Sequence, residues 1–146
     1  MKSNLSIETD SPDVSVLIPD GDDWNTVKVL RCLGQMPTIK NHVLSRRLHS
    51  LAQHSRYCTS FHHNVSQNEQ GWIYEINKLV KKHKIDTILP VTLRGVEIIS
   101  KYHKEISEHV VLPPLAKSEL IALANDKWSF HKFLILPYFH TGFSMF

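Results

Sequence analysis

Short apolar runs rich in β-branched residues alternate along this chain with longer segments of helical periodicity, and this alternation limits the possible folds most strongly. Such runs predict strands at residues 14–18, 39–45, 57–61, 86–91 and 110–113. Strands that alternate with helices form parallel sheets through right-handed crossovers. The sequence therefore predicts an α/β fold with an open, mostly parallel sheet and helices on both faces.

The strongest helical segment spans residues 70–84, where one wide apolar stripe is made up of Trp72, Ile73, Ile76, Leu79 and Val80. Helices are also predicted at 94–106, 118–124 and 126–134, and a single helical turn at 49–53. After the first strand, Asp22 or Asp23 can cap a helix that Gly34 can end. The aromatic, uncharged tail at 135–146 is expected to start no complete new element.

The charge of the chain is small but unevenly distributed. The formal net charge is +3, and the stretch from Trp24 to His63 holds six bases and no acid. That stretch could attract an anion such as a nucleotide phosphate. However, no basic run interleaves with aromatic residues, so a nucleic-acid partner is not expected.

The two cysteines, Cys32 and Cys58, form no CxxC pair and are expected to be reduced thiols. The polar, acidic N-terminus is unlike a secretory signal, and residues 1–12 are expected to form a flexible leader. No apolar run approaches the roughly 20 residues that a membrane helix needs. These features predict a cytoplasmic protein with no membrane partner.

Two loops are the predicted ligand-binding segments, because ligands of open parallel sheets bind beyond the carboxyl ends of the strands. The loop at 19–23 offers Asp20, Gly21 and Asp22, and the loop at 91–95 offers Thr92. Carboxylates would repel a pyrophosphate and no GxGxxG motif is present, so a cation, an amine or a sugar hydroxyl suits the first loop better. The simpler alternative is that these acids cap a helix and shape a turn.

Histidines are numerous around residue 55, but their spacing does not predict a metal site. His49 and His54 are five residues apart, whereas ligands on one helix face are four apart. Cys58, His62 and His63 add no CxxC or HxxxH pattern, so no metal ligand is predicted here. No Ser/His/Asp or Cys/His arrangement predicts a catalytic nucleophile either.

Four ordered segments resemble the start of ATP-grasp ligases of the carbamoyl-phosphate-synthase-like or carboxylate–amine type: VLIPDGDDWNTVKVLRCLG, LAQHSRYC, DTILPVT and LPPLAKSELIALANDKWSFHKFL. The pieces that carry this resemblance are SRY at 55–57, PVT at 90–92 and DK at 126–127. It implies a Rossmann-like pre-ATP-grasp domain at residues 13–117 and the start of the ATP-grasp region at 118–134.

Enzymes of this family use ATP and Mg²⁺ to activate a carboxylate as an acyl-phosphate, which an amine or another nucleophile then attacks. The resemblance implies that Lys127 is the first of two lysines that contact ATP phosphates, and it adds Arg56 to the substrate-loop candidates. The full-length relative would bind ATP and a small-molecule substrate.

This chain departs from the family pattern, because it stops at Phe146, where the lobes with the second lysine and the magnesium ligands should follow. Arg94 also stands just after PVT, where an acid is expected. A single lysine cannot supply the cations that phosphoryl transfer needs. We therefore expect no catalytic residue and no tight binding of ATP or Mg²⁺ by this chain alone.

Three hypotheses follow from the sequence. The first is a truncated ATP-grasp protein that holds the substrate-side domain of an ADP-forming ligase. The second is a stand-alone α/β binding module, with the aromatic tail as a docking or homodimerisation element. The third is a small nucleotide-binding α/β protein, which the missing glycine motif disfavours.

Overall fold

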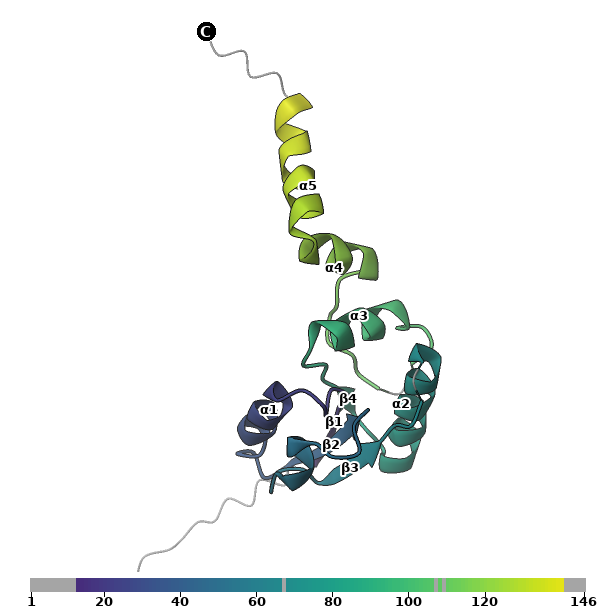
Figure 1. Cartoon of the computed structure of the whole chain (residues 1–146). Coiled ribbons are helices and arrows are strands. Elements are labelled where there is room, and N and C mark those ends of the chain that lie inside the picture. Colours follow the sequence, from purple (N-terminus) through teal and green to yellow (C-terminus); the bar gives the residue numbers. More distant parts are fainter. Residues whose placement is uncertain (1–12, 67, 107, 109, 141–146) are drawn as a thin grey trace, which may run out of the picture.

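A computed structural model of the chain describes residues 13–66, 68–106, 108 and 110–140 and contains a four-stranded sheet (Figure 1). The strands follow the order β3-β2-β1-β4, and all three neighbouring pairs are parallel. Their bounds are Val14–Ile18 for β1, Ile39–Ser45 for β2, Ser60–His63 for β3 and Thr87–Ile88 for β4. The predicted open, parallel α/β sheet is confirmed.

Helices cover both faces of this sheet, as the alternation of side chains along β1 requires. Val16 and Ile18 pack in one apolar cluster with Leu30 of α1 (Asn25–Leu33) and Ala52 of the 3₁₀ helix η1 (Leu51–His54). Leu17 points to the opposite face, where it packs in a second cluster with residues of α2 (Glu69–His83) and α3 (Leu93–Lys101). The apolar stripe predicted for residues 70–84 is the buried face of α2.

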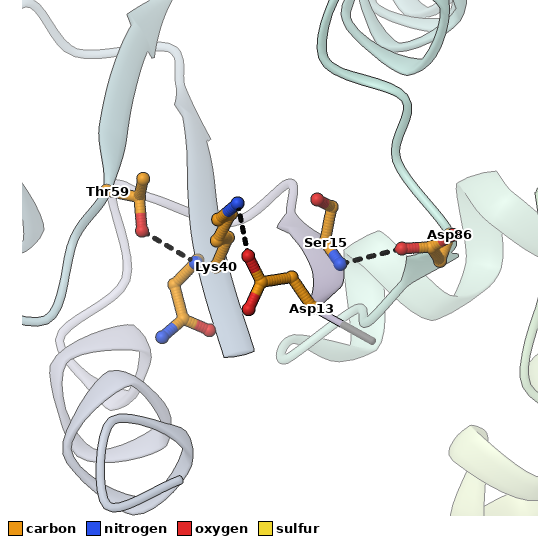
Figure 2. Close-up of polar contacts among 6 residues, drawn as sticks. Asp13, Ser15, Lys40, Thr59 and Asp86 are labelled. Carbon is orange, nitrogen blue, oxygen red and sulfur yellow. Dashed lines mark hydrogen bonds and ion pairs between the residues drawn. The ribbon is translucent and has the colours of Figure 1, made fainter. Parts of the chain in front are cut away.

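Side chains complete the hydrogen bonding at the amino end of the sheet (Figure 2). Asp86 accepts a hydrogen bond of 2.7 Å from the N–H of Ser15, and the hydroxyl of Thr59 accepts one from the strand β2. Asp13 and Lys40 form a 2.5 Å ion pair in which both side chains are about half exposed. These contacts join neighbouring segments at the amino ends of the strands. Ligands of such sheets bind at the other end, beyond the carboxyl ends of the strands.

The strands predicted in the second half of the chain are shorter than expected. Residues 86–91 form only the two-residue β4, because the N–H of Leu89 still donates to the carbonyl of Leu17 but that of Val91 donates to the carboxylate of Asp20. The strand predicted at 110–113 is a single parallel bridge between Val111 and Thr87, and Pro113 has no N–H with which to extend the pairing. The predicted strand at 57–61 begins later, at Ser60.

Two helices follow the sheet domain. α4 (Ser118–Asn125) lies beside α3, and α5 (Lys127–His140) extends away from the sheet (Figure 1). The helix predicted at 126–134 therefore extends to His140, into the tail at 135–146 for which no complete element is predicted. Residues 141–146 of that tail lie outside the described part of the chain. Among the described residues, the helices are too short or too polar to traverse a bilayer.

Candidate functional site

The strand order reverses beside β1, since β2 and β3 lie on one side of it and β4 on the other. In open α/β sheets this switch point is where the carboxyl ends of the strands leave a crevice for ligands. A cleft of about 270 Å³ lies there, between the turn after β1, the residues after β2 and the start of α3. Of the predicted loop residues, Asp20, Asp22 and Thr92 line it.

Asp20 ties the two predicted loops together. Its carboxylate accepts hydrogen bonds from the N–H of Val91 at 2.7 Å, the N–H of Thr92 at 3.2 Å and the Thr92 hydroxyl at 2.8 Å. Burial raises the pKa of this carboxyl, although the three hydrogen bonds to its charged form oppose that rise. Asp20 therefore acts as a clamp that shapes the cleft, and its oxygens are already engaged.

Thr92 and Gly95 complete this clamp. Thr92 is the N-cap of α3, and its hydroxyl oxygen accepts a 3.0 Å hydrogen bond from the N–H of Gly95. Gly95 has to be a small residue, because a Cβ atom there would lie 2.4 Å from the nearer carboxylate oxygen of Asp20. The close approach of α3 to Asp20 thus depends on a missing side chain.

The turn after β1 is held against β2. The N–H of Gly21 donates a 2.9 Å hydrogen bond to the carbonyl of Leu44, and a Cβ on Gly21 would lie 2.6 Å from a methyl carbon of Val43. Gly21 therefore allows the turn to pack closely against β2, and it is not among the residues that line the cleft. Asp23 accepts a 2.7 Å hydrogen bond from the N–H of Asn25, the first residue of α1, but the N-cap of that helix is Trp24, so neither predicted acid occupies the capping position.

Arginines gather at the cleft. Arg46 and Arg47 directly follow β2, and Arg94 lies in the first turn of α3. The guanidinium of Arg46 lies 5.5 Å from the ring centroid of the buried Trp72. Burial, and then the like charge of Arg94, lower the pKa of Arg46, while the charges of Asp22, Asp20 and Glu69 act against that lowering. Neither Arg46 nor Arg94 forms a salt bridge within the described residues, so an anion would relieve their mutual repulsion.

Two predicted site residues lie away from this cleft. Arg56 is exposed, lines a separate hollow beside α1 and η1, and donates a 2.5 Å hydrogen bond to the hydroxyl of Tyr57. Lys127 is exposed at the first position of α5, the helix that extends away from the sheet (Figure 1). Gly21, Asp20, Asp22 and Thr92 are thus brought together, and Arg56 and Lys127 are not.

The cleft also contains residues that the sequence analysis did not select. The rule that ligands bind beyond the carboxyl ends of parallel strands also selects Arg46 and Arg47, because they immediately follow β2, whose bounds are those predicted. Trp72 and Ile98 line the cleft from α2 and α3. Their apolar character predicts only burial, so no sequence signal distinguishes these two from other core residues.

A second cluster lies elsewhere on the sheet, and it shares only His62 with the histidines considered in the sequence. His42, His62 and His83 each offer a ring nitrogen, and these three nitrogens lie within 4.8 Å of one another. Burial is the first cause of a lowered pKa in each ring, and it brings the pKa of His62 to about 4. All three imidazoles are therefore neutral near pH 7.

No protein-family model and no curated protein matches this chain.

Proposed function

We propose that the switch-point cleft binds a small molecule that carries a carboxylate and a hydrogen-bond donor such as an amine. The observation that carries this proposal is the pair Arg46 and Arg94, two cations at one cleft without an acid in salt-bridge contact among the described residues. The planar guanidinium group suits a carboxylate because it can donate two parallel hydrogen bonds.

Acids in the same cleft favour a ligand that carries both charges. Asp22 is exposed in the same cleft, and Asp23 keeps one oxygen outside its hydrogen bond to α1. These carboxylates would accept hydrogen bonds from an ammonium or hydroxyl group. Their charge also disfavours a polyphosphate, which agrees with the missing glycine motif. A volume of about 270 Å³ suits a ligand of amino-acid size.

We further propose that this binding serves an ATP-grasp ligase of the carboxylate–amine type, in which the domain supplies the substrate side. The ordered motifs that end at Asp126 and Lys127 support this reading, and a carboxylate bound beside an amine is the chemistry that such ligases join. Free thiols at Cys32 and Cys58 agree with the cytoplasm as the proposed compartment.

ATP and Mg²⁺ do not fit the residues that this chain presents. Lys127 stands alone and exposed at the start of α5, and one cation cannot hold a triphosphate for transfer. In the proposed function ATP binding therefore needs further lobes, and Lys127 contributes only one phosphate contact. In this proposal the described residues bind the small substrate and leave the phosphoryl transfer to those lobes.

Thermal unfolding with small probes tests the cleft. L-Glutamate, with both a carboxylate and an amine, is expected to raise the Tm in a concentration-dependent way, and malonate, without the amine, is expected to raise it less. Arg94→Gln should remove the effect of both probes. The matched control is Arg56→Gln, which changes an exposed arginine outside the cleft and should keep the wild-type response.

Two results would contradict the cleft proposal: no probe shifts the Tm, or Arg56→Gln loses as much response as Arg94→Gln. The ligase part is tested separately with ATP and Mg²⁺. Hydrolysis of ATP by the purified chain, abolished by Lys127→Ala, would show that the catalytic machinery is present after all.

A stand-alone docking module is the second candidate, because α5 exposes a series of large apolar side chains: Trp128, Phe130, Phe133 and Leu134. If they mediate homodimerisation, size measurement by light scattering will give a discrete dimer. Phe133→Glu should then convert the dimer to a monomer. A monomeric wild-type chain would exclude this candidate.

A further inference from the structure

Three histidines from three elements meet on the sheet face that α2 covers. His42 lies in β2, His62 in the edge strand β3, and His83 is the last residue of α2. The strand register pairs Leu44 with His62, so His62 lies on the same face as Leu44 and His42, two residues apart along β2. The helix end then places His83 over both, with ring centroids 4.8 Å from each.

Two of these rings hold a nitrogen that is buried and has no hydrogen-bond partner among the described residues. His42 is 5% exposed, and its Nε2 is one of these nitrogens. The other is Nε2 of His83. Buried polar atoms normally have a partner, so each such atom needs an explanation. A metal ion bound between the rings would satisfy both nitrogens at once.

Ser60 can set the proton positions that metal binding requires. Its hydroxyl oxygen lies 2.6 Å from Nδ1 of His42 and 2.8 Å from Nε2 of His62. A serine hydroxyl can accept two hydrogen bonds, so both rings can carry a proton on the nitrogen that faces Ser60. That arrangement leaves a lone pair on Nε2 of His42 and on Nδ1 of His62. A residue that fixes the tautomer of metal-bound histidines in this way is a common feature of metal sites.

We propose that His42, His62 and His83 form a binding site for a divalent transition-metal ion, with Zn²⁺ as the ion that fits best. Three imidazoles and an open fourth position form a known tetrahedral zinc geometry. Zinc–nitrogen bonds of about 2.0–2.1 Å put ligand nitrogens roughly 3.4 Å apart, so the three nitrogens, now within 4.8 Å of one another, have to approach by up to about 1.4 Å. Rotation of the half-buried His62 and His83 rings can supply that movement.

The charges around the cluster are mixed, because Lys82 acts on His62 and His83 and Lys40 acts on His42, whereas Glu75 acts on His62 in the opposite sense. Glu75 lies on α2 two helical turns before His83, its charge acts on His62, and its Oε2 is buried without a partner among the described residues. This carboxylate offsets part of the charge of a bound ion. The metal would join β2, the edge strand β3 and the end of α2, so its expected role is to stabilise the fold.

Titration of the full-length, metal-free chain with Zn²⁺ tests this inference. Calorimetry should show one ion bound per chain, and the ion should raise the Tm. His83→Gln should remove the stoichiometric binding, and His42→Gln should do the same. Ser60→Ala should weaken the affinity about 10–100-fold, as loss of a partner that orients a metal ligand does. His54→Gln is the matched control, because it changes an exposed histidine outside the cluster and should bind Zn²⁺ as the wild type does.

His83→Gln is the most informative variant, because His83 is half-buried at the end of α2 and its replacement should leave the fold intact. Circular dichroism will verify that the variant is folded. Unchanged Zn²⁺ binding by folded His83→Gln would overturn the proposal. An equal loss of binding in His54→Gln would also overturn it, because scattered surface histidines would then explain the signal. Neither result bears on the switch-point cleft, whose test uses L-glutamate without metal.

Discussion

Replacing Gly95 with alanine is expected to destabilise the fold, although alanine favours a helix more than glycine does. A Cβ on Gly95 would lie 2.4 Å from one carboxylate oxygen of Asp20 and 2.6 Å from the other. These oxygens cannot move aside easily, because Asp20 is 8% exposed and accepts three hydrogen bonds from Val91 and Thr92. The substitution therefore acts on the clamp that shapes the cleft.

The magnitude follows from the distances. Ordinary contact begins near 3.4 Å, so the carboxylate has to retreat by about 1 Å, which is enough to break hydrogen bonds of 2.7 to 3.2 Å. Leaving this buried carboxylate with poorer partners costs about 2–4 kcal/mol, and the helix propensity of alanine offsets about 1 kcal/mol. The expected net loss in the free energy of unfolding is about 1–3 kcal/mol.

Urea unfolding followed by circular dichroism measures this loss, and a double-mutant cycle identifies its cause. In an Asp20→Ala background the obstructing carboxylate is gone, so Gly95→Ala should be neutral or stabilising by up to about 1 kcal/mol. The reasoning fails if Gly95→Ala stabilises the wild type. It also fails if the substitution costs the same with and without Asp20.

Three further outcomes are expected. Ile76→Ala, at a fully buried position of α2, should lower the free energy of unfolding in urea by about 2–5 kcal/mol. A loss below about 1 kcal/mol would contradict the burial of Ile76 in the core. Asp86→Ala should cost about 1–3 kcal/mol because it leaves the N–H of Ser15 without its partner, whereas Lys40→Ala, which breaks only an exposed ion pair, should cost about 0.5 kcal/mol or less. The pKa of His62 is lowered from 6.5 to about 4 in the folded chain, so the unfolded chain gains the proton first as pH falls. Metal-free protein should therefore lose stability from pH 6.5 down to pH 4, by about 1–2 kcal/mol after allowance for solvent screening, and His62→Gln should flatten this dependence.

The sequence predicts those parts of the fold that depend on local patterns. β1 and β2 have the bounds predicted for them. The almost continuous apolar run of β1 is a sufficient signal for a buried parallel strand, whereas β2 (IKNHVLS) also contains polar residues. The helical spacing of the apolar residues in α2 likewise predicts which of its side chains are buried. β4 is shorter than predicted because the N–H of Val91 donates to the Asp20 side chain, a contact that no local pattern predicts. The Val111 bridge is shorter because Pro113 has no N–H with which to extend the pairing.

The candidate sites were only partly predictable, since they depend on how distant segments meet. The carboxyl-end rule places Asp20 and Thr92 together, although 71 and 72 residues separate Asp20 from its two hydrogen-bonding partners Val91 and Thr92. The cluster of His42, His62 and His83 has no local spacing rule. It requires the register of two strands and the point at which α2 ends, and a shift of one residue in either would separate the rings.

Chemical-shift mapping by NMR on the ¹⁵N-labelled chain tests the central claim, that the switch-point cleft is the ligand site, most directly. On addition of L-glutamate, the account predicts saturable shifts at Arg46, Thr92 and Arg94, and almost none at Arg56 and Tyr57. Saturable shifts confined to the hollow around Arg56, or no shifts at the three cleft residues, would contradict it.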